Sequence, residues 1–120
     1  MSESIYHITT RAAWSAGKEA GAYKADSLES AWFIHCSKAE QVLRVANEFY
    51  SNLPDLVILV IDPSRLKPML HWEPGTDKAD ELFPHIYGPL NLDAVLNVFD
   101  LKPGLDGKFK LPPEVGLVTS

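Results

Sequence analysis

The stretch LVILVI, residues 56–61, is the longest apolar run in the chain and decides its fold. A short continuous apolar run rich in Val and Ile is typical of a strand that is buried on both faces. Such a strand has neighbours on both sides, so we predict that residues 56–61 form the central strand of a sheet. The run is also far too short to span a bilayer as a helix.

The segment before this strand is predicted to be a helix over residues 38–50. The letters SKAE at residues 37–40 match a capping box in which Ser37 is the N-cap. Apolar residues then recur at helical spacing, at Val42, Leu43, Ala46, Phe49 and Tyr50.

The first third of the chain is expected to hold a helix between short strands. The strands are SIYHI at residues 4–8, AYKA at 22–25 and WFIHC at 32–36. Thr10 is placed to cap a helix that continues to about Glu19 and ends near Gly21. DSLES, at residues 26–30, predicts a polar turn.

Strands dominate the second half of the chain. The expected strands are MLHWE at residues 69–73, HIYG at 85–88 and AVLNVFDL at 94–101. Two helices early and strands clustered late favour an α+β domain. We expect one domain over residues 1–120, with a core at about 4–102 and a Gly- and Pro-rich surface extension at 103–120.

Composition and charge limit the classes of function. The net charge is −5 and no Lys- or Arg-rich stripe occurs, so we expect no extended nucleic-acid interface. Cys36 is the only cysteine, which rules out an internal disulfide and a multi-cysteine zinc site. The start, MSESIYHITT, has no signal-peptide pattern and no apolar run is long enough for a membrane span. A protein of the reducing cytoplasm is therefore expected.

The four histidines share one pattern, in which each precedes an apolar residue or cysteine and then a hydroxyl or carboxyl group. The four instances are His7-Ile8-Thr9, His35-Cys36-Ser37, His71-Trp72-Glu73 and His85-Ile86-Tyr87. Residues i and i+2 of a strand point to one face and residue i+1 to the other. Each stretch is therefore expected to bury its middle residue and to turn a histidine and an oxygen the opposite way. The pattern fits either one shared polar cleft or separate, internally satisfied pairs.

Three chemistries were weighed for such a cleft. A metal site has no supporting ligand spacing, although His35, Glu73 and His85 can converge in space. Cys36 stands before a helix start, where a thiol pKa is lowered, but strand alternation favours its burial. Ser37 is expected to be occupied as an N-cap. Glu73 lies at a strand end beside an aromatic residue and a proline, which fits either a held carboxylate with a raised pKa or a solvated strand-end charge.

Several segments together resemble the bacterial family catalogued as domain of unknown function 952. They are IYHITTRAAW, YKADSLES, FIHCSKAEQVLRVANEFY, LVILVIDPSRL, HWE and FPHIYGPLNLDAV, which occur in this order between residues 5 and 101. The chain departs from the family pattern before FIHCS, where Ala31-Trp32 replaces the usual Glu-Gly pair. The family resembles the ADP-ribosyltransferase-like fold, which is a mixed, split β-structure around an NAD-binding cleft.

This resemblance implies a set of roles. In that fold a first-strand His, with Thr or Ser two residues later, grips a ribose of NAD, and His7 and Thr9 match that position. The usual middle-strand Tyr and late catalytic Glu have no clear counterparts, and a branch of the fold with His and Arg at these places processes an RNA phosphate with NAD. The implied NAD-binding residues are His7, Thr9, Ser37 and Tyr87, and the implied catalytic residues are His35, Glu73 and His85.

The function expected from the sequence is thus binding of a nucleotide, with NAD as the cofactor or substrate, and transferase or hydrolase chemistry on it. Two other functions remain open at this stage. One is a non-catalytic module that binds a small anionic metabolite. The other is a metal-dependent hydrolase.

Overall fold

The computed structural model describes residues 4–51, 53–75, 80–104 and 106–109. Its helices and strands, in chain order, are β1 (Ile5–Thr10), α1 (Arg11–Ala20), β2 (Ala22–Tyr23), α2 (Ser27–Ser30), β3 (Ile34–His35), α3 (Ala39–Phe49), β4 (Leu56–Ile61), β5 (Met69–Pro74), β6 (Leu82–Tyr87), β7 (Leu90–Asn91) and β8 (Val95–Leu101). Short 3-10 turns cover Pro63–Arg65 and Leu92–Ala94.

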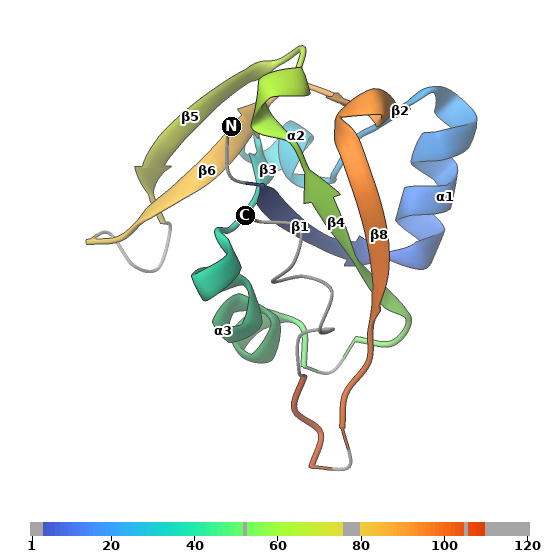
Figure 1. The fold of residues 1–120 in the computed structure, drawn as a ribbon, viewed down its shortest axis with the longest axis vertical. Coiled ribbons are helices and arrows are strands. Elements are labelled where there is room, and N and C mark those ends of the chain that lie inside the picture. Colours follow the sequence, from blue (N-terminus) through green and yellow to red (C-terminus); the bar gives the residue numbers. More distant parts are fainter. Residues whose placement is uncertain (1–3, 52, 76–79, 105, 110–120) are drawn as a thin grey trace.

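The strands form three small sheets, with orders β1-β4-β8, β2-β7 and β3-β6-β5. Every pairing between these described strands is antiparallel. The α+β class is therefore confirmed, and the sheet is split as expected. The expectation of mixed pairing is wrong, because no described strand has a parallel neighbour. Antiparallel strands need only short connections, and the β5–β6 hairpin in Figure 1 is an example.

Strand β4 is the centre of the molecule, as predicted. It lies between β1 and β8, and all six of its residues are almost completely buried. Its alternate residues enter two different cores. Val57, Leu59 and Ile61 pack in the core beside α1, whereas Leu56, Ile58 and Val60 pack in the core beside α3. Figure 1 shows the two helices on opposite sides of this strand.

Helix α1 begins and ends as predicted. Thr10 Oγ1 accepts a hydrogen bond from the Ala13 backbone N–H at 3.1 Å, which satisfies one of the free donors of the first turn. Gly21 ends the helix with a φ of 88°, a left-handed conformation that glycine adopts without steric cost.

Helix α3 begins one residue later than the predicted cap implies. Lys38 is the N-cap, and its backbone N–H donates to Gln41 Oε1 at 2.9 Å. Ser37 instead pairs with Tyr6 in an isolated antiparallel bridge, through two backbone hydrogen bonds of 2.8 Å. The expectation that Ser37 is an N-cap is therefore wrong, because backbone pairing with β1 holds it in extended form.

Two other segments differ from expectation around β3. Residues 26–30 were expected to be a turn, but Ser27–Ser30 form one helical turn. The strand expected at 32–36 is reduced to two residues, since Trp32 has a φ of 73° and is 78% exposed. This left-handed conformation favours glycine. The family pattern that the sequence resembles has glycine at the position of Trp32.

The packed part of the chain extends past residue 102. Phe109 is 2% exposed and belongs to the core beside α3, and its backbone N–H donates to Asn47 Oδ1 at 2.8 Å. The description of residues 103–120 as a surface extension is therefore corrected at Phe109, where apolar burial and a hydrogen bond hold the chain on α3. Residues 110–120 lie outside the described residues.

Gly17 allows α1 to pack closely on β2. A Cβ at this position would lie 2.9 Å from Tyr23 Cα and 3.0 Å from Tyr23 Cβ. We expect Gly17→Ala to lower the free energy of unfolding by about 2 kcal/mol, because the overlap with backbone outweighs the better helix propensity of alanine. Urea denaturation measures the change, with the exposed neighbouring substitution Ser15→Ala as control. A Gly17→Ala protein as stable as the wild type would contradict this close contact.

Candidate functional site

Three of the four histidines form a row across the sheet β3-β6-β5. His35 is the register partner of His85, and His85 is in turn the partner of His71. Directly opposed residues of antiparallel strands point to the same face, so the three imidazoles share one side of the sheet. The rings of His35 and His85 are 5.5 Å apart.

His85 is the buried member of this row and is held by a carboxylate. Its Nδ1 donates to Glu73 Oε1 at 2.9 Å, and the Tyr87 hydroxyl donates to the same oxygen at 2.5 Å. These hydrogen bonds, that of Tyr87 first, lower the pKa of Glu73, so the carboxylate is ionised at neutral pH. Of the two alternatives for this strand end, the raised pKa is therefore wrong. Because the ionised Glu73 accepts the proton on Nδ1, the neutral form of His85 carries its proton on Nδ1 and its free lone pair on Nε2.

Phe33 fixes the plane of the His85 ring. The two rings stack with centroids 3.9 Å apart and an interplanar angle of 20°, and Phe33 also meets His35 edge-on at 4.6 Å. Sequence reasoning missed this residue. Strand alternation contains the signal, because Phe33 stands two residues before His35 and so falls on the same face.

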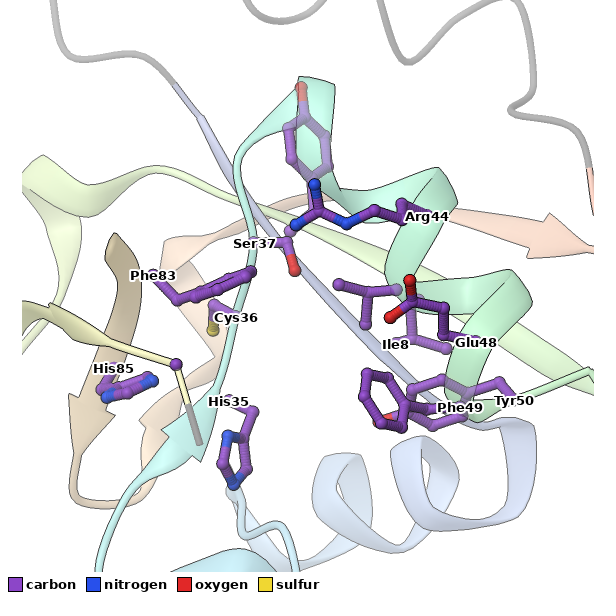
Figure 2. A pocket seen from close by; sticks show the side chains of 13 residues that line it. Ile8, His35, Cys36, Ser37, Arg44, Glu48, Phe49, Tyr50, Phe83 and His85 are labelled. Atoms are coloured by element: carbon purple, nitrogen blue, oxygen red, sulfur yellow. The ribbon is translucent and has the colours of Figure 1, made fainter. Parts of the chain in front are cut away.

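A cavity of about 360 Å³ lies between this sheet and helix α3. His35 and His85 line one end of it, and α3 contributes Arg44, Glu48 and Phe49 to the opposite wall, as Figure 2 shows. None of the three helical residues was predicted as a site residue. Arg44 and Glu48 are polar residues of the helix, which a sequence alone does not distinguish from an ordinary solvated face, and Phe49 was assigned to its apolar face.

Ser37 and Cys36 also line the cavity. Ser37 is 5% exposed, and Figure 2 shows its hydroxyl turned into the cavity. Among the residues that the structure describes, this hydroxyl has no hydrogen-bond partner. Cys36 is buried as expected, and desolvation raises the pKa of its thiol, so it is an uncharged part of the wall.

His7 and Thr9 lie away from the cavity in a buried polar cluster with Tyr23. His7 Nδ1 donates to the His35 carbonyl at 2.6 Å, and the Tyr23 hydroxyl is hydrogen-bonded to both His7 Nε2 and Thr9 Oγ1, each at 2.8 Å. Desolvation lowers the pKa of His7 to about 4, so the ring is neutral. Both ring nitrogens are occupied, and Tyr23 is a partner that the sequence pattern did not reveal.

The remaining predicted site residues are Glu73 on β5 and Tyr87 on β6. Both reach His85 on the same face of the sheet without lining the cavity, and the Tyr87 ring meets His71 at 5.2 Å. Trp72, which was expected in the core, is 45% exposed, because β5 is an edge strand that nothing described covers on that side. The alternation prediction holds for Ile8, Cys36 and Ile86, which are all buried.

Neither a metal-binding cluster nor a membrane-spanning helix occurs within the described residues. No group of three or more His, Cys, Asp or Glu side chains is arranged to hold a metal ion there. No helix in the same ranges is long and apolar enough to cross a membrane.

The fold and the cavity define a small α+β protein with a row of histidines beside a helix-walled pocket. The chain belongs to the family described as protein of unknown function DUF952, whose pattern matches residues 8–98. None of the curated proteins matches the chain.

The solved structures include a similar protein, CC0527 of Caulobacter crescentus. Its crystal structure has a TM-score of 0.83 at 32% identity and covers 94% of this chain and 98% of its own. Its solution NMR structure has a TM-score of 0.70 at 33% identity, with coverage of 88% and 90%. The match with the crystal structure therefore covers nearly the whole length of both chains.

Proposed function

We propose that the chain binds a nucleotide in the cavity between α3 and the sheet β3-β6-β5, and that His85 accepts a proton during a transferase or hydrolase reaction. The observation that carries the proposal is the pairing of His85 with Glu73. An ionised carboxylate holds Nδ1, and Nε2 has no hydrogen-bond partner among the described residues. His85 is 2% exposed and lines the cavity, so a bound ligand is the natural partner of Nε2.

NAD is the candidate nucleotide, through the resemblance to the ADP-ribosyltransferase-like fold. The volume of about 360 Å³ is at the lower end of the range for small-molecule sites. A cavity of this size can hold one ring and its ribose, and the rest of the dinucleotide would lie outside the cavity. In this reaction the bond from ribose to nicotinamide breaks and nicotinamide leaves with the bonding electrons. The attacking water or alcohol bonds to the ribose carbon and gives its proton to His85 Nε2.

The residues around His85 have defined parts in this proposal. Glu73 does not line the cavity, so it acts as a positioning residue that holds the tautomer and stabilises the imidazolium. Phe33 fixes the ring plane, and Ser37 offers a hydroxyl to the ligand. His35 has its pKa lowered by desolvation and then by His85, so it remains uncharged at neutral pH and is a second proton acceptor. His7 supports the backbone of β3 from behind through the His35 carbonyl, and Thr9 is linked to His7 through the Tyr23 hydroxyl.

The proposal is tested by titrating NAD into the protein and following both the thermal midpoint and the histidine ring signals by NMR. We expect stabilisation with shifts of the His35 and His85 rings and none of the His7 ring. A nicotinamide-release assay then compares the wild type with Glu73→Gln. The rate is expected to fall by about 100-fold while NAD still binds, because general-base assistance is weakened and the cavity is not altered.

Glu29→Gln is the matched control, since it makes the same change at an exposed residue of α2. No stabilisation and no ring shifts with millimolar NAD would end the nucleotide proposal. Binding without nicotinamide release in the wild type would favour the alternative of a non-catalytic binding module. That alternative draws on Arg44, a cationic residue of the cavity wall, and a small anionic metabolite would have to compete there with Glu81, to which the guanidinium is bound.

A further inference from the structure

Two opposite charges stand on the helical wall of the cavity. Arg44 and Glu48 are four residues apart on α3, about 6 Å along the helix axis, and both line the cavity. Arg44 Nη2 donates to both carboxylate oxygens of Glu81, at 2.7 and 2.8 Å. The Arg44 charge is therefore balanced by the carboxylate of Glu81, the residue immediately before β6.

Glu48 has no such balance. No ion pair or hydrogen bond joins its carboxylate to another of the described residues, and the side chain is exposed. Figure 2 shows the carboxylate turned from α3 toward the cavity, between Arg44 and Phe49. The helical wall consequently presents one uncompensated negative charge to whatever occupies the cavity.

Aromatic rings surround the same space. Phe49, Tyr50 and Phe83 line the cavity, and the Phe49 side chain is 54% exposed. The faces of aromatic rings carry partial negative charge and attract cations. An unpaired carboxylate and aromatic walls favour the same chemical class of ligand, which is a flat ring with a positive charge.

We propose that Glu48 is a specificity-determining residue, which makes the cavity prefer a positively charged pyridine ring to an uncharged ring of the same shape. This inference rests on the proposed nucleotide function and narrows it. Oxidised nicotinamide carries that positive charge, whereas reduced nicotinamide and free nicotinamide do not. The site then favours oxidised NAD over reduced NAD. Oxidised NAD is the form whose nicotinamide ring can leave, because the positively charged ring departs as an uncharged molecule.

The test uses two small probes, nicotinamide and nicotinamide methylated on its ring nitrogen, which is a permanent cation. Each is titrated into the wild type, Glu48→Gln and Glu40→Gln, and binding is followed by the NMR shifts of the His35 and His85 rings. Glu40→Gln is the matched control, because Glu40 is an exposed residue of the same helix that does not line the cavity. NAD and its reduced form are titrated in parallel.

We expect the wild type to bind the methylated cation more tightly than nicotinamide. Glu48→Gln is expected to weaken binding of the cation about five-fold, as for a solvent-accessible charge pair, and to leave nicotinamide binding unchanged. Glu40→Gln is expected to leave the affinity for both probes unchanged.

The outcomes separate this inference from the proposed function. Equal binding of the two probes, or an unchanged preference in Glu48→Gln, overturns the role of Glu48 even when NAD stabilises the protein. If NAD and both probes fail to bind, the nucleotide proposal and this inference fall together. A preference for the reduced form of NAD would contradict the inference alone.

Discussion

Leu59→Ala is expected to lower the free energy of unfolding by about 3–4 kcal/mol, which is the largest effect of a single substitution that we predict. Leu59 is 0% exposed at the centre of β4 and packs in the core beside α1. Leu59 packs among residues that are themselves buried, so the substitution leaves a cavity inside the core. Ile58→Ala should cost a similar amount, although the Ile58 side chain points to the other core, beside α3.

Leu96→Ala is the matched control, because Leu96 lies on the edge strand β8 and is 40% exposed. We expect it to cost less than about 1 kcal/mol, since little apolar surface is lost from the interior. Urea denaturation of the three variants measures the differences. A small cost at Leu59 with a large one at Ile58 would mean that β4 has only one buried face, contrary to the two-core arrangement.

The elements that sequence predicted well are those with a local physical signal. β4 is a run of aliphatic residues that only a strand buried on both faces accommodates, and α3 has apolar residues at helical spacing. The cap at Thr10 and the glycine at 21 bound α1 through contacts within the same segment. Nothing outside these segments was needed to place them.

The elements that were predicted wrongly depend on contacts distant in sequence. Ser37 has the residue type of an N-cap, but the backbone of Tyr6 pairs with it and moves the helix start to Lys38. Strand alternation predicted that Trp72 is buried in the core. Alternation identifies the two faces of a strand, but it does not show which face is covered by other elements. Phe109 was assigned to the surface because the C-terminal segment is rich in Gly and Pro, but Asn47 and the core beside α3 hold it.

The same contrast between local signals and contacts distant in sequence applies to the candidate site. Alternation predicted that His35 and His85 share a face, since that depends only on each strand and their pairing. It also predicted that His7 joins them, and here the structure differs. β1 belongs to another sheet, so His7 supports β3 through the His35 carbonyl instead of facing the cavity. The cavity itself requires α3 to pack on β1 and to face β3 and β6 across a gap, which no local pattern encodes.

His7 is also the residue for which acid should matter most. Its side chain is buried with both nitrogens hydrogen-bonded, and burial lowers its pKa from the ordinary 6.5 to about 4. The unfolded chain therefore takes up a proton at His7 before the folded protein does, as the pH falls through this range. Folding stability must decrease from about pH 6.5 down to about pH 4, where the loss approaches about 3 kcal/mol.

Urea denaturation at pH 7 and pH 4.5 measures this loss, and His7→Asn should show a smaller difference between the two pH values. His35→Asn is the control: the lowered pKa of His35 acts in the same direction, but its ring is only partly buried, so its contribution should be smaller. NMR of the wild-type His7 ring gives an independent reading, because it must stay neutral at pH 5. A His7 ring that titrates near pH 6.5 while the protein is folded would contradict the buried cluster with Tyr23. A protonated ring would still donate from Nδ1 to the His35 carbonyl, but Nε2 could no longer accept a hydrogen bond from the Tyr23 hydroxyl, so the contact with Tyr23 would have to rearrange without unfolding the protein.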